Sequence, residues 1–366
     1  MYLENIIGQE EAKLFLTNMY KSRCISPTLF FLGPAGYGGL PLSIAYARQL
    51  LFNEKDPSNY LKLDTLQHPD LHFIFPTAPN VLSSDLFYKW REFIKNNSYG
   101  NLFQWLEYIK IGNKTGKIGI EETQKIIKKL QMKSYEGGYK VLIMWMPERL
   151  NVVAANNLLK ILEYPPEKTI MLFVGEEERG LLPPILSRLQ LLRLKPIPVK
   201  EIQKILQKKY NLIEKKAIVI AQGAEGDLGR TLQLIQCTEE NDFGEVFRQW
   251  IRNIFLFIKK TKALKTLIEW SEVLHNWGKE RQIQFLDYCL YIFRIALFTH
   301  YNVKKLTFNP LQWKKVDWEY FSTYIQWENM KGILKEINKA SREIWKNAHA
   351  NLVFLDLSIQ IAKYLH

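Results

Sequence analysis

Short, mostly apolar runs alternate with helix-like patterns through the first half of the chain. Such runs occupy residues 28–32, 71–75, 141–144, 169–174 and 191–194. Strands that are apolar at nearly every position are buried on both faces, as in parallel sheets whose crossover connections are helices. The pattern therefore predicts an α/β domain in which helices cover both faces of a parallel sheet.

The pattern becomes helical after about residue 195. Short helices are expected over 199–210, 214–222 and 228–235, with a glycine-rich break between the last two. Long amphipathic stretches with almost no strand signal then continue to the end of the chain, as expected for packed helices.

These changes of pattern predict three domains. An α/β domain is expected over residues 1–195, a small helical domain over 196–240 and an all-α domain over 241–366. A chain of this length is long enough for two or three domains.

The last region carries most of the tryptophans, which we interpret mainly as core and helix-packing residues. They include Trp250, Trp270, Trp277, Trp313, Trp318, Trp327 and Trp345. Stacking platforms for nucleic-acid bases are the less favoured alternative.

Composition leaves the class of partner open. The chain is 47% hydrophobic and 24% charged, which is ordinary for a folded protein, and its formal net charge is +13. A strong positive charge suits a nucleic-acid or acidic protein partner, although a lysine-rich composition alone would give the same value. The lysines are scattered in pairs along the chain, which weakens the nucleic-acid interpretation.

Cysteines and apolar runs exclude several classes. Cys24, Cys237 and Cys289 are odd in number and far apart, which excludes a disulfide framework and a local cysteine-rich metal site. The first ten residues lack the pattern of a signal peptide, and no apolar run approaches the ~20 residues that span a bilayer. We expect a cytoplasmic protein with no membrane partner.

The glycine-rich segment 33–40 has the shape of a phosphate-binding loop without its chemistry. It follows a predicted strand and precedes a helix. A working loop reads G-x-x-x-x-G-K-[ST], with a lysine for the phosphates and a hydroxyl for Mg²⁺. Gly33 and Gly38 are in place, but Gly39 and Leu40 occupy the lysine and hydroxyl positions. Pro41 removes a further backbone donor.

The acidic end of the metal-binding strand, the Walker B position, is also missing. After the run 141–144, Trp145 and Met146 stand where acidic residues would help to hold Mg²⁺. Loss of the lysine, the hydroxyl and both acids together indicates a chain that does not hydrolyse ATP. We expect no bound cofactor and no metal, and the loop then serves as a strand-to-helix turn.

Four segments resemble the bacterial clamp-loader family of AAA+ proteins, and its delta prime subunits in particular. They are residues 5–10 (NIIGQE), 68–72 (HPDLH), 154–166 (AANNLLKILEYPP) and 182–189 (LPPILSRL). The resemblance covers residues 1–195 well, and 226–230 resembles the start of the last lid helix. It implies a RecA-like AAA+ domain, a helical lid and a helical C-terminal collar for oligomerisation.

The resemblance also implies a role for Arg188 and the adjacent Ser187. In this family the arginine acts as an arginine finger, reaching the ATP site of a neighbouring subunit. The alternative is an ordinary surface salt bridge. Leu189 replaces the usual cysteine and keeps an apolar packing residue.

Other departures favour a stator-like subunit over a motor. Residues 53–67 contain no cysteine, where many relatives carry a four-cysteine zinc module, so no zinc is expected. The polar sensor position holds Gly175 and Glu176, and the lid arginine position holds Gly229, with Arg230 one residue later.

The resemblance thus implies a non-catalytic subunit of the DNA polymerase III clamp loader. Its expected partners are the gamma/tau motor and the delta subunit, with weak or indirect contact to the sliding clamp and primed DNA. Two alternatives stay open: an ATP-hydrolysing motor with an unusual loop, and a DNA-binding replication adaptor.

Overall fold

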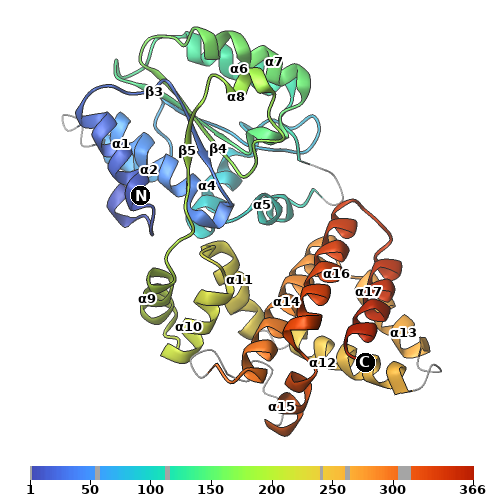
Figure 1. Ribbon diagram of the computed structural model, residues 1–366. Coiled ribbons are helices and arrows are strands. Elements are labelled where there is room, and N and C mark those ends of the chain that lie inside the picture. The colour runs from blue at the N-terminus through green and yellow to red at the C-terminus, as the bar shows by residue number, and fades with distance from the viewer. Residues whose placement is uncertain (1, 54–57, 112–115, 240–241, 260–263, 304–314) are drawn as a thin grey trace. The chain divides into compact units, whose positions relative to one another are not determined.

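The computed structural model describes residues 2–53, 58–111, 116–239, 242–259, 264–303 and 315–366. The chain divides into two compact units (Figure 1). The first consists of Met1–Glu201 with Glu225–Gly229, and the second of Ile202–Ala224 with Arg230–His366.

A five-stranded parallel sheet organises the first unit. Its strands are β1 (Thr28–Leu32), β2 (Leu71–Ile74), β3 (Lys140–Trp145), β4 (Thr169–Gly175) and β5 (Gln190–Arg193), in the spatial order β2-β3-β4-β1-β5. Each of the five predicted strands is confirmed to within one residue at either end. The central strands β1, β3 and β4 are buried along their whole length, as their continuous apolar sequences predict.

Helices and short 3₁₀ turns connect these strands. They are η1 (Leu3–Asn5), α1 (Glu10–Lys21), η2 (Ala35–Tyr37), α2 (Gly39–Leu51), α3 (Ser58–Asp64), α4 (Phe87–Asn96), α5 (Leu102–Tyr108), α6 (Ile120–Gln131), η3 (Pro147–Arg149), α7 (Val152–Glu163) and α8 (Pro183–Leu186).

Two apolar cores lie on opposite faces of the sheet. One contains residues of α1, α2, α4 and α5, and the other contains residues of α6, α7 and α8. Figure 1 shows α1 and α2 on one side of the sheet and α6 and α7 on the other. The expected α/β class, with helices on both faces of a parallel sheet, is confirmed.

The His-Pro-Asp segment before β2 has a structural role. His68 is buried, and its Nδ1 accepts a hydrogen bond from the Asp70 amide (3.1 Å). The Asp70 carboxylate accepts bonds from the amides of Tyr135 (2.7 Å) and Glu136 (3.0 Å). The segment thereby fastens the start of β2 to the loop that precedes β3.

The second unit is helical throughout its described part, apart from the connecting turns. Its helices are most of α9 (Val199–Tyr210) and most of α11 (Leu228–Glu239), together with α10 (Glu214–Gly223), α12 (Asp242–Lys259), α13 (Leu264–His275), α14 (Lys279–His300), α15 (Lys315–Thr323), α16 (Trp327–Trp345) and α17 (Ala350–Tyr364). None of the described helices is both long enough and apolar enough to cross a membrane.

Tryptophans of the second unit divide into core and surface residues. Trp250 and Trp270 are buried and stacked, with ring centroids 5.2 Å apart, and Trp318 is also buried. Trp327 and Trp345 are exposed, so the core interpretation is wrong for these two. Trp313 lies outside the described residues.

The division into three domains stays a prediction. The proposed boundary at residues 240 and 241 falls outside the described residues. Most of the predicted small helical domain packs in one compact unit with the C-terminal helices.

Candidate functional site

The phosphate-loop segment forms a tight connection between β1 and α2. The Gly33 amide donates to the Gly175 carbonyl oxygen at the end of β4 (3.0 Å). Gly38 has φ +90°, in the left-handed region that favours glycine, and stands directly before the first residue of α2. The structure therefore has the strand–turn–helix geometry that the sequence predicts for this loop.

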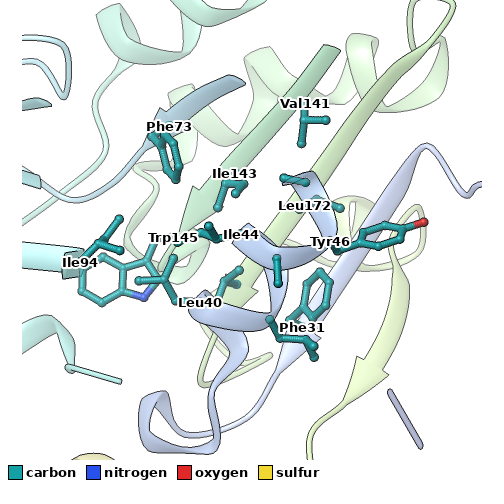
Figure 2. Packing of buried hydrophobic residues seen from close by; sticks show 14 of the residues in the cluster. Phe31, Leu40, Ile44, Tyr46, Phe73, Ile94, Val141, Ile143, Trp145 and Leu172 are labelled. Carbon is teal, nitrogen blue, oxygen red and sulfur yellow. The ribbon is translucent and has the colours of Figure 1, made fainter. Parts of the chain in front are cut away.

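Apolar side chains fill the space that the loop encloses. Leu40, Trp145 and Met146 are all buried, at 3%, 1% and 3% exposure. Leu40 and Trp145 lie in the same packed cluster, one on α2 and the other at the end of β3 (Figure 2). The structure thus brings the two degenerate halves of the predicted nucleotide site together.

Little empty space remains between them. The cavity lined by Gly33, Gly39, Leu40, Trp145 and Met146, among others, has a volume of about 10 Å³. That volume is about enough for one water molecule, whereas small-molecule sites usually offer about 300–1,000 Å³. A nucleotide has no room here unless side chains move.

Two residues from distant segments close the loop further. A Cβ atom at Gly38 would lie 2.8 Å from the Tyr99 ring, and one at Gly36 would lie 1.6 Å from Asp227 Oδ1. Tyr99 is fixed because its hydroxyl accepts a bond from the Ile7 amide (3.2 Å). The loop is therefore packed against protein atoms at both Gly36 and Gly38.

Carboxylates add an unfavourable charge for phosphate. The Ala35 amide in the loop donates to Glu176 Oε1 (3.2 Å), and the Glu176 amide donates to Glu148 Oε1 (3.0 Å). Desolvation, and then the charge of Glu148, raise the pKa of Glu176 to about 7. Desolvation also raises the pKa of Glu148, whose Oε2 is buried without a hydrogen-bond partner in the described structure. When ionised, these carboxylates would place like charge against a triphosphate at this loop.

Sequence reasoning missed Tyr99, Asp227 and Glu148 as parts of this site. It named Glu176 only because this residue departs from the family pattern at the polar sensor position. These residues lie on four separate segments. Asp227 stands within the recognised segment 226–230 and Glu148 directly after Trp145-Met146-Pro147, which are the signals that could have indicated them, whereas Tyr99 belongs to no recognised motif.

Arg188 lies just after α8 and is held by local contacts. Its Nη1 donates to the Pro184 carbonyl oxygen (2.7 Å), and its Nη2 pairs with the Glu163 carboxylate at the end of α7. The Arg188 side chain is 32% exposed. The backbone is fixed by a hydrogen bond from Thr28 Oγ1 to the Arg188 carbonyl oxygen (2.7 Å). The structure thus joins two motifs, the Ser-Arg segment and the Leu-Glu end of α7.

The neighbouring predicted residues have simpler positions. Ser187 is exposed at the end of α8, with its hydroxyl donating to the Pro184 carbonyl oxygen (3.1 Å), and Leu189 is buried in the core beneath α8.

The described residues contain no group of three or more His, Cys, Asp or Glu side chains arranged to hold a metal ion. Part of the predicted zinc-free stretch, residues 54–57, lies outside the described residues, as does the side chain of Cys237.

The parallel sheet and its phosphate-type loop define a RecA-like α/β protein of the AAA+ class. Comparison with known protein families matches residues 8–198 to the family described as "DNA polymerase III, delta subunit". Because the match covers half of the chain, the chain belongs to this family, which confirms the expectation from the four sequence segments.

Individual relatives agree with this family. The chain is 30% identical over 185 residues to DNA polymerase III subunit delta prime of Haemophilus influenzae, covering 50% of this chain and 53% of the relative. It is 24% identical over 197 residues to that subunit of Bacillus subtilis, covering 52% and 48%. The chain thus spans about half the length of these relatives.

Solved structures show a more distant likeness. A DNA polymerase III gamma subunit-related protein from Thermotoga maritima aligns with 96% of this chain and 99% of its own, at 16% identity and a TM-score of 0.36.

Proposed function

We propose that this chain is a non-catalytic, stator-like subunit of the DNA polymerase III clamp loader. It would take part in loading the sliding clamp onto primed DNA during replication without binding or hydrolysing ATP itself. One observation carries the proposal: the cavity between the phosphate-loop segment and the end of β3 has a volume of only about 10 Å³.

Three further features support the absence of ATPase activity. The lysine and hydroxyl positions hold Gly39 and Leu40, so neither a phosphate contact nor a magnesium ligand is supplied. Trp145 fills the position of a metal-binding acid. The loop amide of Ala35 already donates to the Glu176 carboxylate. These features weigh against the alternative of a motor subunit.

Isothermal titration calorimetry of the full chain with Mg-ATP tests this part of the proposal. We expect no saturable heat up to millimolar ATP, because binding would require displacing packed apolar side chains. A motor subunit titrated under the same conditions is the positive control for ATP binding. Stoichiometric binding at micromolar concentration would refute the proposal.

We further propose that Arg188 acts on the ATP site of a neighbouring motor subunit. Its pair with Glu163 is partly exposed, with 32% and 39% of the two side chains accessible. Such pairs contribute at most about 1 kcal/mol, so the guanidinium can exchange this partner for a phosphate at small cost. A planar, permanently charged donor suits the charge that develops on a transferring phosphate.

Matched substitutions separate this role from an ordinary salt bridge. In the reconstituted complex, Arg188→Ala should abolish hydrolysis at the adjacent site, since arginine fingers are worth about 10³–10⁵ in rate. Arg188→Lys should also be impaired, because a point charge lacks the planar fork. Glu163→Ala removes the same ion pair but keeps the arginine, and should leave hydrolysis intact.

The measurement is clamp- and DNA-stimulated ATP turnover, resolved by site through single-turnover kinetics. Total turnover should fall only in part, because the other sites keep working. Equal effects of Arg188→Ala and Glu163→Ala on ATP turnover would show that the arginine acts only through its ion pair with Glu163, and would refute the arginine-finger role.

The partners follow from the same proposal. They are the gamma/tau motor and the delta subunit, with weak or indirect contact to the clamp and primed DNA, in the cytoplasm. Residues 241–366 would form the collar that joins the subunits. Co-purification with these partners tests the proposal. Normal assembly of a chain that lacks residues 241–366 would refute the assignment of these residues to the collar.

A further inference from the structure

A second and larger cavity lies at the outer edge of β2, away from the phosphate loop. Its volume is about 200 Å³. Because β2 is the terminal strand of the sheet, the cavity stands where the two helical layers meet at the sheet edge. Leu71 and Phe73 of β2, Phe87 of α4 and Ile126 of α6 supply its apolar lining.

The apolar part of this cavity fits one ring-sized side chain. Phe73 belongs to the core on one face of the sheet and Ile126 to the core on the other, and both are buried. Figure 2 shows Phe73 at the side of the packed cluster. A cavity of about 150 Å³ can take up benzene, so the volume of about 200 Å³, part of which is lined by polar side chains, is enough for one aromatic ring.

Two lysines give the cavity a positive rim. Lys125 and Lys129 are exposed and line the cavity from α6. Their spacing of four residues places them on one face of the helix. Within the described residues, neither ammonium group makes an ion pair or a hydrogen bond, so both are available to a ligand.

The other ionisable groups of the cavity offset only part of this positive charge, because Glu122 brings one negative charge against the two lysines. Glu122 is already engaged, since its carboxylate accepts bonds from the Ser83 amide (2.8 Å) and from the Ser83 hydroxyl. Desolvation, and then the charges of Lys129 and Lys140, lower the pKa of His72 to about 4. The imidazole is therefore neutral near pH 7 and adds no charge of its own.

We propose that this cavity binds an acidic peptide segment of a partner protein. One aromatic side chain of the segment would enter the cavity and pack against the neighbouring rings of Phe73 and Phe87, which are in contact with each other (ring centroids 5.9 Å apart), and neighbouring carboxylates would pair with Lys125 and Lys129. Room for a single ring, combined with two lysines that have no ion-pair partner in the described residues at its rim, matches the chemistry of a short acidic peptide with one aromatic residue. This site lies beyond the proposed stator and arginine functions and does not depend on them.

Fluorescence anisotropy of the full chain with a labelled Gly-Asp-Asp-Phe-Asp-Asp-Gly peptide tests the proposal. We expect saturable binding that weakens with salt and falls about tenfold or more when alanine replaces the phenylalanine. Lys125→Glu and Lys129→Glu should each weaken binding about tenfold or more, because like charges then face each other. Lys128→Glu is the matched control, since Lys128 is exposed on the same helix but does not line the cavity, and it should change affinity less than about twofold.

A blocking variant tests occupancy of the cavity itself. Ser84 is an exposed lining residue, so Ser84→Trp can fill the cavity from the rim while circular dichroism and the thermal midpoint report an intact fold. Loss of peptide binding in this variant supports the site. The proposal is overturned by no saturation at millimolar peptide, by unchanged binding in Ser84→Trp, or by equal losses in Lys128→Glu and Lys129→Glu. Tighter binding of a single-stranded oligodeoxynucleotide with the same dependence on Lys125 and Lys129 would overturn it in favour of nucleic acid.

Discussion

Replacing Trp145 by alanine should strongly destabilise the first unit, because this ring is buried in the same packed cluster as Leu40 of the glycine-rich segment. Trp145 is 1% exposed, and its ring centroid lies 5.0 Å from that of Trp90 and 6.4 Å from that of Phe93. The residue ends β3, a central strand fixed by two parallel neighbours. The surroundings therefore have little freedom to collapse into the space that the substitution leaves.

The magnitude follows from the burial of the ring. Removing a buried tryptophan or phenylalanine side chain typically costs about 3–5 kcal/mol, as lost transfer free energy plus the cavity left behind. Domains are stable by only about 5–15 kcal/mol, so the unit should lose about a fifth or more of its stability. In a unit of this size, each kcal/mol shifts the thermal midpoint by about 2–4 °C, which gives a fall of about 6–20 °C.

Urea unfolding followed by far-ultraviolet circular dichroism measures this loss without relying on tryptophan fluorescence. Trp327→Ala is the matched control, because it removes the same type of side chain from a position on α16 where the residue is 60% exposed. We expect that control to change the free energy of unfolding by less than about 0.5 kcal/mol. A loss below about 1 kcal/mol for Trp145→Ala, or a loss equal to that of the control, would refute the view that this ring closes the site by packing.

Three other substitutions test the electrostatics and the helix ends. The pKa of Glu176 rises from 4.5 to about 7 on folding, so its carboxylate destabilises the folded state increasingly as the pH rises through this window. Glu176→Gln should therefore raise the thermal midpoint above about pH 7 but not near pH 4, and a difference that is constant from pH 4 to 8 would contradict this. Lys140 is 4% exposed and donates to carbonyl oxygens at the end of α6, so Lys140→Met should cost about 2 kcal/mol in urea unfolding, whereas the exposed Lys128→Met should cost almost nothing. The Asn151 side chain caps α7 by accepting an amide hydrogen bond (2.7 Å); Asn151→Ala should cost about 1 kcal/mol, while Asn156→Ala within that helix should be neutral or slightly stabilising.

The strands of the sheet were predictable from sequence because their burial leaves a local trace. A strand covered on both faces must be apolar at nearly every position. The runs at 28–32 and 169–174 show this, and they became β1 and β4. The family was predictable for a similar reason, since its motifs are short, contiguous and in a fixed order.

The predicted loss of nucleotide chemistry rests on local positions of the chain. A phosphate loop needs specific side chains at adjacent positions, so Gly39 and Leu40 predict the loss. In the same way, Trp145 at the end of β3 and Met146 directly after it predict that no acid is present there. These are predictions from sequence about which groups the proposed site lacks.

Only the tertiary structure decided what occupies the place of those groups. Tyr99, Glu176 and Asp227 reach the loop from segments far apart in the chain, and Arg188 meets Glu163 across 25 residues. Likewise, the helical pattern could not separate the buried Trp250 from the exposed Trp327. Local sequence sets which residues a strand or helix presents, but long-range packing sets which of those faces are covered, charged or left open.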